Sequence, residues 1–159
     1  MSDTPLRLGP DDPALPAVLA LLRDSFAYME DRIDPPSSLT RMTEATLARD
    51  AAENELWVIP GAPGTAPLAC VILTRKPDHL YIGKLAVARD GRGRGLARRL
   101  IGLAEDRARA QGLTQLRLQT RIELTENHAT FTRLGFTEIA RTAHEGYDRP
   151  TSLTFAKEI

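Results

Sequence analysis

One turn in the sequence combines the residue types that bind phosphate groups. Glycines and arginines alternate from Gly91 to Gly95, between a β-rich run that ends at Ala88 and a helical pattern. Glycine has no Cβ atom, so the backbone can approach a ligand closely, and the first N–H groups of a helix lack intrahelical acceptors. The helix dipole favours an anion at the same end. The turn therefore predicts a phosphate-binding loop.

The spacing of these glycines excludes two common phosphate loops. A nucleoside triphosphate loop requires Gly-Lys followed by Ser or Thr, whereas Gly95 is followed by Leu96 and Ala97. A dinucleotide loop requires its third glycine three positions after the second, and Gly91, Gly93 and Leu96 do not have that spacing. A solvated surface turn is the structural alternative, but the position between a strand and a helix favours phosphate binding.

Positive charge is concentrated next to this turn. The chain has 21 basic and 21 acidic side chains, and 18 of the basic residues are arginine. Seven arginines lie between Arg89 and Arg109, against Asp90, Glu105 and Asp106, and this local excess suits a polyanionic cofactor. The zero net charge and the lack of interleaved aromatic residues argue against a nucleic-acid partner.

The sequence offers little support for other kinds of chemistry. Cys70 is the single cysteine, so an internal disulfide is excluded and a reducing compartment is expected. No Cys or His spacing resembles a zinc site, and no Ser-His-Asp or Cys-His arrangement is evident, so no metal is predicted. The acidic, proline-containing start and the absence of a long apolar run predict a cytoplasmic protein without a membrane segment.

Hydrophobic periodicity predicts the elements that must position the turn. The 159 residues contain no internal repeat or linker, and a chain of this length can close one core, so a single domain over residues 1–159 is expected. The strand–helix–strand unit around residues 82–120 predicts one parallel pair in a mixed sheet. The expected strands are 5–8, 56–60, 68–74, 79–88, 116–120, 136–143 and 151–156, and the expected helices are 14–29, 38–53, 93–110 and 125–134.

Three segments of the chain resemble a known family. Arg92-Gly93-Arg94-Gly95-Leu96-Ala97 resembles the Arg/Gln-x-x-Gly-x-Gly/Ala signature of the GNAT superfamily of acyl-CoA-dependent N-acyltransferases. The preceding Lys84-Leu85-Ala86-Val87 resembles its fourth strand, and Leu124 to Phe136 resembles its second cofactor segment. The resemblance, over about residues 5–157, implies an α/β (α+β) fold. Its mixed, mostly antiparallel sheet would have six or seven strands, about four flanking helices and a splayed fourth and fifth strand pair.

The resemblance also implies acetyl-CoA as co-substrate and a set of residues that bind it. The main chain of Leu85, Ala86 and Val87 would pair with the pantetheine arm, and the N–H of Val87 would stabilise the oxyanion. Asn127 would hydrogen-bond the pantetheine, although its side chain could instead help to open the helix that starts at Thr125. The pyrophosphate would be held by the backbone amides of Arg92, Gly93, Arg94, Gly95, Leu96 and Ala97.

The catalytic residues of the family are matched less well. Phe131 stands where many members have a tyrosine that protonates the departing thiolate, so the cofactor pocket has no acid at that position. Tyr81 occupies the place where some members carry a glutamate base, and His79 lies two residues earlier, nominally on the same face. Both are candidate catalytic residues, and packing or surface roles remain as alternatives. His144 and its loop neighbours are candidates for contact with the acceptor.

The leading hypothesis is an N-acetyltransferase that moves the acetyl group of acetyl-CoA directly to a primary amine of a small molecule or a peptide. Phe131 and the missing base motivate the alternative, a non-catalytic acyl-CoA-binding or sensing module. The expected acceptor loops mix both signs of charge, so the sequence selects neither a cationic nor an acidic acceptor. They contain Glu30, Asp31, Arg32, Asp34, Glu145, Asp148 and Arg149. The oligomeric state is left open between monomer and homodimer.

Overall fold

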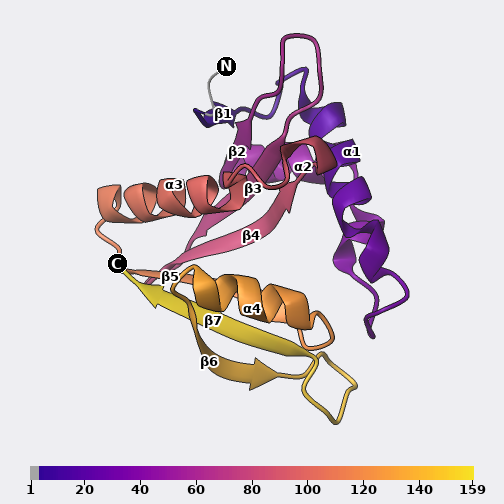
Figure 1. Cartoon of the computed structure of the whole chain (residues 1–159), viewed down its shortest axis with the longest axis vertical. Helices are drawn as coiled ribbons and strands as arrows, with labels where there is room; N and C mark the ends of the chain where they lie inside the picture. The colour runs from indigo at the N-terminus through magenta and orange to yellow at the C-terminus, as the bar shows by residue number, and fades with distance from the viewer. Residues whose placement is uncertain (1–3) are drawn as a thin grey trace.

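The computed structural model describes residues 4–159, and its strands form a seven-stranded sheet in the order β1-β2-β3-β4-β5-β7-β6 (Figure 1). Neighbouring strands are antiparallel except β4 and β5, which are parallel, so the predicted mixed sheet is confirmed. The expected domain of residues 1–159 includes residues 1–3, which lie outside the described part. The strands are β1 (Leu6–Leu8), β2 (Glu55–Ile59), β3 (Ala69–Arg75), β4 (Leu80–Val87), β5 (Gln115–Arg121), β6 (Thr137–Thr142) and β7 (Ser152–Glu158).

Four α-helices and three short 3-10 helices complete the described part of the chain. None of them combines the length and the apolar character that crossing a bilayer requires. The α-helices are α1 (Leu15–Phe26), α2 (Glu44–Glu53), α3 (Leu96–Ala110) and α4 (Thr125–Arg133). The 3-10 helices are η1 (Ala27–Met29), η2 (Ser38–Arg41) and η3 (Arg89–Gly91).

Two predicted helix boundaries are wrong. The expected helix 38–53 is divided, because Thr43 is extended and forms a capping box with Thr46. Thr43 Oγ1 accepts from the Thr46 N–H at 3.2 Å, and Thr46 Oγ1 accepts from the Thr43 N–H at 2.9 Å. The expected helix 93–110 starts only at Leu96, because Gly93 and Gly95 have φ of +80° and +72°. Two left-handed residues are incompatible with a right-handed helix.

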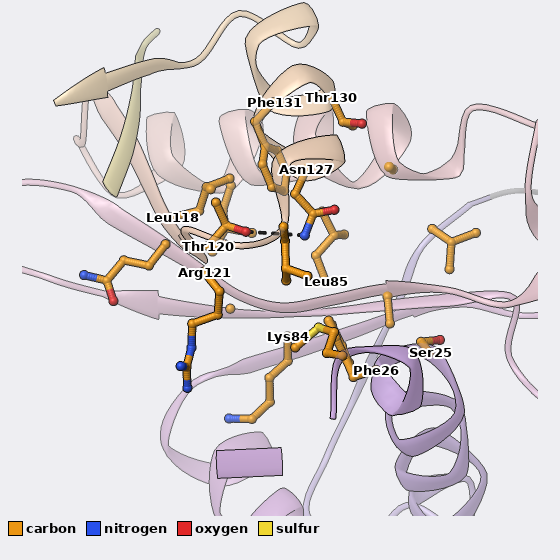
Figure 2. A pocket seen from close by; sticks show the side chains of 18 of the residues that line it. Ser25, Phe26, Lys84, Leu85, Leu118, Thr120, Arg121, Asn127, Thr130 and Phe131 are labelled. Carbon is orange, nitrogen blue, oxygen red and sulfur yellow. Dashed lines mark hydrogen bonds between the residues drawn. The ribbon is translucent and has the colours of Figure 1, made fainter. Parts of the chain in front are cut away.

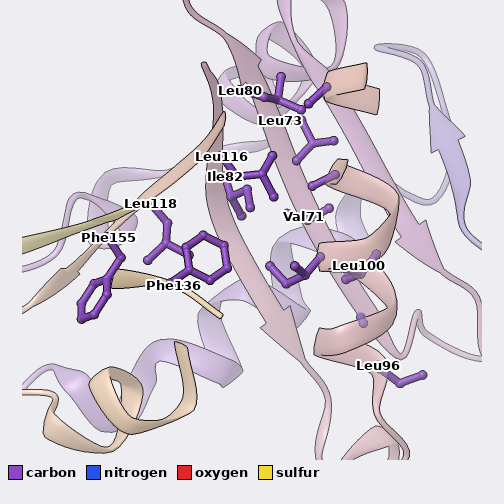
Figure 3. Close-up of a cluster of buried hydrophobic side chains, with 14 of the residues drawn as sticks. Val71, Leu73, Leu80, Ile82, Leu96, Leu100, Leu116, Leu118, Phe136 and Phe155 are labelled. Carbon is purple, nitrogen blue, oxygen red and sulfur yellow. The ribbon is translucent and has the colours of Figure 1, made fainter. Parts of the chain in front are cut away.

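The core divides into two layers, one on each face of the sheet. Val71 and Leu73 of β3 face the first layer with α3, whereas Cys70 and Ile72 face the second with α1 and α2. This alternation is the two-residue period of a strand that is buried on both faces. Figure 3 shows the first layer, in which Leu100 of α3 packs near the central strands and the aromatic rings extend it toward β7. The sheet therefore carries helices on both sides.

Strand β4 contains a bulge that changes which face its side chains take. Cys70 pairs with Ala86, but Ile72 pairs with Gly83, so β4 has one extra residue between these pairs. Lys84 lies in this extra segment with φ of +50°, the left-handed region. Before the bulge Ile82 belongs to the α3 layer, and after it Ala86 belongs to the α1 layer. The bulge thus turns the last residues of β4 as the strand leaves β5.

The predicted splay between β4 and β5 is present. The two strands pair only at Leu80 with Leu116 and at Tyr81 with Arg117. Beyond Tyr81 the two strands no longer pair with each other, although β4 continues to Val87 and β5 to Arg121. Figure 1 shows the two strands diverging, so a gap lined by main-chain edges opens in the middle of the sheet.

Candidate active site

A cavity of about 790 Å³ occupies the splay between β4 and β5. Its walls come from both strands, from the first helical turns of α3, from α4 and from the C-terminal end of α1. Figure 2 shows side chains of α4 on one side of the strands, and Lys84, Arg121, Ser25 and Phe26 on the other. The volume is in the range of small-molecule sites. The cavity therefore connects two compartments across the opened sheet.

The glycine-rich turn forms one end of this cavity. An added Cβ at Gly93 or Gly95 would meet no atom within 4 Å, so the backbone here borders open space. Helix α3 begins after Gly95 without a side-chain cap, which leaves its first N–H groups directed out of the helix. A Cβ at Gly91 would lie 2.8 Å from Leu96, so that glycine serves packing. The turn has the form of an anion-binding helix start.

Most of the predicted cofactor-binding residues of this turn line the cavity. Arg92, Gly93, Gly95, Leu96 and Ala97 all do so. Arg94 instead lines a second hollow of about 300 Å³, together with residues of the turn between β2 and β3. The structure thus brings five of these six residues together at the cavity.

The exposed edge of β4 forms the cavity's middle section. Leu85, Ala86 and Val87 all line it. The N–H of Ala88 donates to Leu68 O at 2.7 Å on the β3 side. Main-chain groups alternate in direction along a strand, so the N–H of Val87 points away from β3 and toward the gap left by β5. This direction is the one that the predicted main-chain donor requires.

Helix α4 supplies a polar and an aromatic group to the same cavity. Asn127 Nδ2 donates to Thr120 Oγ1 of β5 at 3.3 Å, as Figure 2 shows. Its side chain therefore bonds to the sheet, and no side-chain hydrogen bond caps the start of α4. Phe131 lines the cavity and packs its ring 6.0 Å from Phe136 and 6.3 Å from Phe155.

The two threonines that flank Phe131 in α4 do not replace the missing tyrosine. Thr130 lines the cavity, but its Oγ1 donates to Glu126 O at 3.0 Å. Thr132 Oγ1 donates to His128 O at 2.8 Å and does not line the cavity. Both threonines thus use their hydroxyl protons within α4, and Phe131 has none.

The two predicted catalytic side chains are separated by the structure. Tyr81 lines the cavity at the last paired position of β4, and burial raises the pKa of its phenol. His79 does not line the cavity. It lies before β4, with Nδ1 2.6 Å from Asp78 Oδ1, at the end where β4 and β5 are still paired. A position on the same face of the strand as Tyr81 therefore does not bring His79 to the cavity, because the cavity opens only where the pairing of β4 with β5 ends.

Two basic residues that line the cavity were not assigned a role from the sequence, and a third residue, His144, was a candidate for contact with the acceptor. Lys84 and Arg121 line its α1 side, and His144 reaches it from the loop between β6 and β7. Burial, and then the nearby charge of Arg121, lower the pKa of His144. His144 Nδ1 contacts the hydroxyl of the buried Thr151. The only sequence signal was the polar composition of the loop around His144.

Two loops far apart in sequence meet over the α1 side of the cavity. Tyr147 donates its hydroxyl to Asp34 Oδ1 at 2.6 Å, and Arg149 lies 3.4 Å from Asp34 Oδ2. Arg32 of the same first loop pairs with Glu126 of α4 at 2.9 Å. Asp34 and Arg149 thus pair between the two loops, and Arg32 ties the first loop to α4.

Comparison with solved structures gives the same fold at low sequence identity. A GNAT family acetyltransferase from Elizabethkingia anophelis with acetyl-CoA bound has a TM-score of 0.69 at 14% identity, over 100% of both chains. The ribosomal-protein-S18-alanine N-acetyltransferase from Escherichia coli has a TM-score of 0.68 at 21% identity, over 98% of this chain and 94% of that one. An IAA acetyltransferase from Bacillus cereus ATCC 14579 has 0.66 at 18%, over 98% and 99%.

Comparison by sequence gives the family. No curated protein matches the chain. The family model described as the acetyltransferase (GNAT) family matches residues 15–136, a range that includes the glycine-rich turn, the splayed strands and α4. The fold with its splayed β4 and β5, and the sequence match over most of the chain, lead to one conclusion: this protein belongs to the acetyltransferase (GNAT) family.

Proposed function

We propose that this protein is an N-acetyltransferase that moves the acetyl group of acetyl-CoA directly to a primary amine. The observation that carries the proposal is the continuity of one cavity from the helix start at Gly95, along the free edge of β4 at Val87, to the polar side chains near Lys84. Acetyl-CoA, when bound, supplies an activated thioester. The family membership and the acetyl-CoA bound to the Elizabethkingia anophelis protein support this assignment.

The residues on the α3 and α4 side would hold the cofactor. The N–H groups from Arg92 to Ala97 offer donors and a favourable helix dipole to the pyrophosphate, with Arg92 adding charge. Asn127 offers a side-chain amide, and Phe131 offers an apolar wall. The open space beside Gly93 and Gly95 supports this assignment, because a phosphate needs close approach to the backbone.

Val87 would provide the electrophilic assistance. Its N–H points into the gap between β4 and β5, where charge would develop on the thioester oxygen during attack by the amine. A fixed main-chain donor stabilises such charge without reorganisation, and removing one such donor typically costs about a hundredfold to a thousandfold in rate. Direct transfer is favoured over a cysteine intermediate, because Cys70 is buried and burial raises the pKa of its thiol to about 12.

We assign to His144 the role of taking the proton from the attacking amine, because it is the histidine among the described lining residues of the cavity. It lines the cavity, and its lowered pKa keeps the imidazole neutral at pH 7. Tyr81, with its raised pKa, would shape the wall as a neutral phenol. The thiolate would leave without a protein acid at Phe131. A thiol with a pKa of about 8.5 is a fair leaving group near neutral pH.

A non-catalytic acyl-CoA-binding module remains the second candidate, and Phe131 is the observation that favours it. Thiol release from acetyl-CoA in the presence of a panel of primary amines separates the two functions. Turnover that needs an amine supports the transferase. A thermal shift with CoA and no thiol release with any amine supports the binding module.

A further inference from the structure

The charged side chains that line the cavity are all basic. Among the described lining residues there is no aspartate or glutamate, whereas Lys84, Arg92 and Arg121 line it together with His144. Arg92 lies in the glycine-rich turn, on the cofactor side. Lys84 and Arg121 lie on the opposite side of the strands, where Figure 2 shows both side chains extending away from α4. The acceptor side therefore carries basic side chains that are separate from those on the cofactor side.

Arg121 is held in place without a carboxylate partner. Its Nη1 donates to Pro35 O at 2.7 Å and its Nη2 to Pro36 O at 3.1 Å. Within residues 4–159 no carboxylate oxygen lies within 4 Å of this guanidinium. Burial lowers its pKa, and Glu123 and Asp34 act in the other direction from a longer distance. A guanidinium has five N–H donors, so two neutral carbonyls leave both charge and donors for a ligand.

Lys84 adds a second, partly compensated charge. Its Nζ lies 3.5 Å from Asp50 Oδ2, a long contact, and its side chain is 32% exposed. The bulge with φ of +50° places this lysine at the point where β4 leaves β5. An ammonium ion and a guanidinium without an ion pair line the same cavity, so the site attracts an anionic group and repels a second cation.

Two carboxylates near the cavity, one in a loop and one in α4, are engaged with other side chains. Asp34 binds Tyr147 and Arg149, and its own N–H donates to Glu123 Oε2 at 3.2 Å. Glu126 pairs with Arg32. None of these carboxylates lines the cavity. The contacts between Asp34 and the loop at Tyr147 also join the two loops over the acceptor side, which favours a small acceptor over an extended chain.

We propose that the acceptor is a small primary amine that also carries an anionic group, a carboxylate or a phosphate, bound by Arg121 with the help of Lys84. This inference rests on the proposed acetyltransferase function and deepens it. The sequence left both signs of charge open for the acceptor, and the structure removes the loop acids from the cavity. The anionic group would anchor the acceptor, and its amine would face the gap at Val87.

The test compares amines that differ only in this group. A panel of amino acids is assayed against the matching α-amides, and ethanolamine phosphate against ethanolamine, with spermidine as the cationic probe. Rates of thiol release are compared at equal concentrations of the unprotonated form of each amine. We expect the anionic member of at least one pair to have a kcat/KM about tenfold to a hundredfold higher, mainly through KM. The two arms separate carboxylate from phosphate.

Variants assign the preference to residues. Arg121→Gln and Lys84→Met should each reduce the ratio of kcat/KM between the anionic and the matching uncharged amine to about threefold or less. A hydrogen bond to a charged group accounts for a difference as large as the tenfold to hundredfold preference that is lost. Arg141→Gln is the matched control, since Arg141 lies on the exposed edge strand β6 and pairs with Glu138. The control should keep the full preference. CoA affinity, measured by calorimetry, should be unchanged in all three variants.

A second measurement does not depend on turnover. Binding of an acetylated amino acid to the CoA-saturated protein is compared with binding of its acetylated amide, in the wild type and in Arg121→Gln. Equal binding of the two, or a preference for amides or spermidine, overturns the inference, as does a preference that survives both substitutions. If the protein binds CoA but binds neither acetylated product, this inference about the acceptor is refuted and the proposed function is not. Failure to bind CoA refutes the proposed function and this inference with it.

Discussion

The hydroxyl of Tyr147 donates a 2.6 Å hydrogen bond to Oδ1 of Asp34, 113 residues away in sequence. This contact joins the loop after β6 to the loop after α1, and Arg149 reinforces it from 3.4 Å. The same hydrogen bond raises the pKa of the Tyr147 phenol. The acceptor side of the cavity is therefore bounded by two loops that hold each other.

Tyr147→Phe should loosen this boundary and leave the cofactor side intact. We expect the KM for the acceptor to rise about two- to tenfold, the range that one hydrogen bond contributes, with the Kd for CoA unchanged. Steady-state kinetics and calorimetry measure the two quantities. Asp148→Asn is the control, because Asp148 is an exposed neighbour in the same loop. An equal rise in both variants would show that loop charge, and not the hydrogen bond to Asp34, sets the KM.

Gly95→Ala should weaken CoA binding more than it weakens the fold. The alanine must adopt φ of +72°, which costs about 1 kcal/mol, and its Cβ enters the open space beside the turn. CoA at a hundred times its Kd should stabilise the wild type by about 2.7 kcal/mol, or roughly 5–10 °C in Tm. We expect the variant's Kd for CoA to rise at least about tenfold.

Gly102→Ala is the matched control for that experiment. Gly102 lies within α3, and an added Cβ there meets no atom within 4 Å. Alanine in a helix interior should raise stability by about 1 kcal/mol relative to glycine, with the shift caused by CoA unchanged. Comparable CoA affinity in Gly95→Ala and Gly102→Ala would contradict the assignment of the turn as the phosphate site.

The parts of the site that sequence could predict are those fixed by local chemistry. The turn at Gly93 and Gly95 follows from glycine's freedom at positive φ, and the splay beyond Tyr81 follows from the family resemblance. The boundary of α2 was missed because Thr46, which is neither Glu nor Gln, completes the capping box of Thr43.

Arg121 and Lys84 were missed for a different reason. The charge around Arg121 depends on which distant acids reach it, and Asp34 is withdrawn by Tyr147 and Arg149, more than a hundred residues away. Lys84 reaches the cavity because a bulge in β4 breaks the two-residue alternation. Such long-range contacts and register changes are absent from a periodicity argument.

Phe131→Tyr should keep CoA binding and should raise kcat or leave it unchanged. The substitution adds a proton donor at the cavity wall, where Phe131 packs against Phe136 and Phe155. General acids contribute at most about 10²–10⁴-fold, and a thiolate leaving group needs little of this. Thiol release measures the effect. Lost turnover in a folded variant that still binds CoA would show instead that the apolar ring packs against the acceptor.

His144→Gln should remove the acidic limb of the pH profile. Burial and the charge of Arg121 place the pKa of His144 below the ordinary value of about 6.5. The neutral base therefore forms as the pH rises through that lowered pKa, and kcat/KM should rise with it. A second rise should follow as the acceptor amine loses its own proton at higher pH.

In His144→Gln only that second rise should remain, with a rate at pH 7 lower by up to about a hundredfold. His79→Gln is the matched control, because His79 contacts Asp78 outside the cavity, and its profile should equal that of the wild type. An acidic limb that persists in His144→Gln and disappears in His79→Gln would transfer the role of base to His79. It would also place the acceptor amine nearer to the paired end of β4 and β5, where His79 lies.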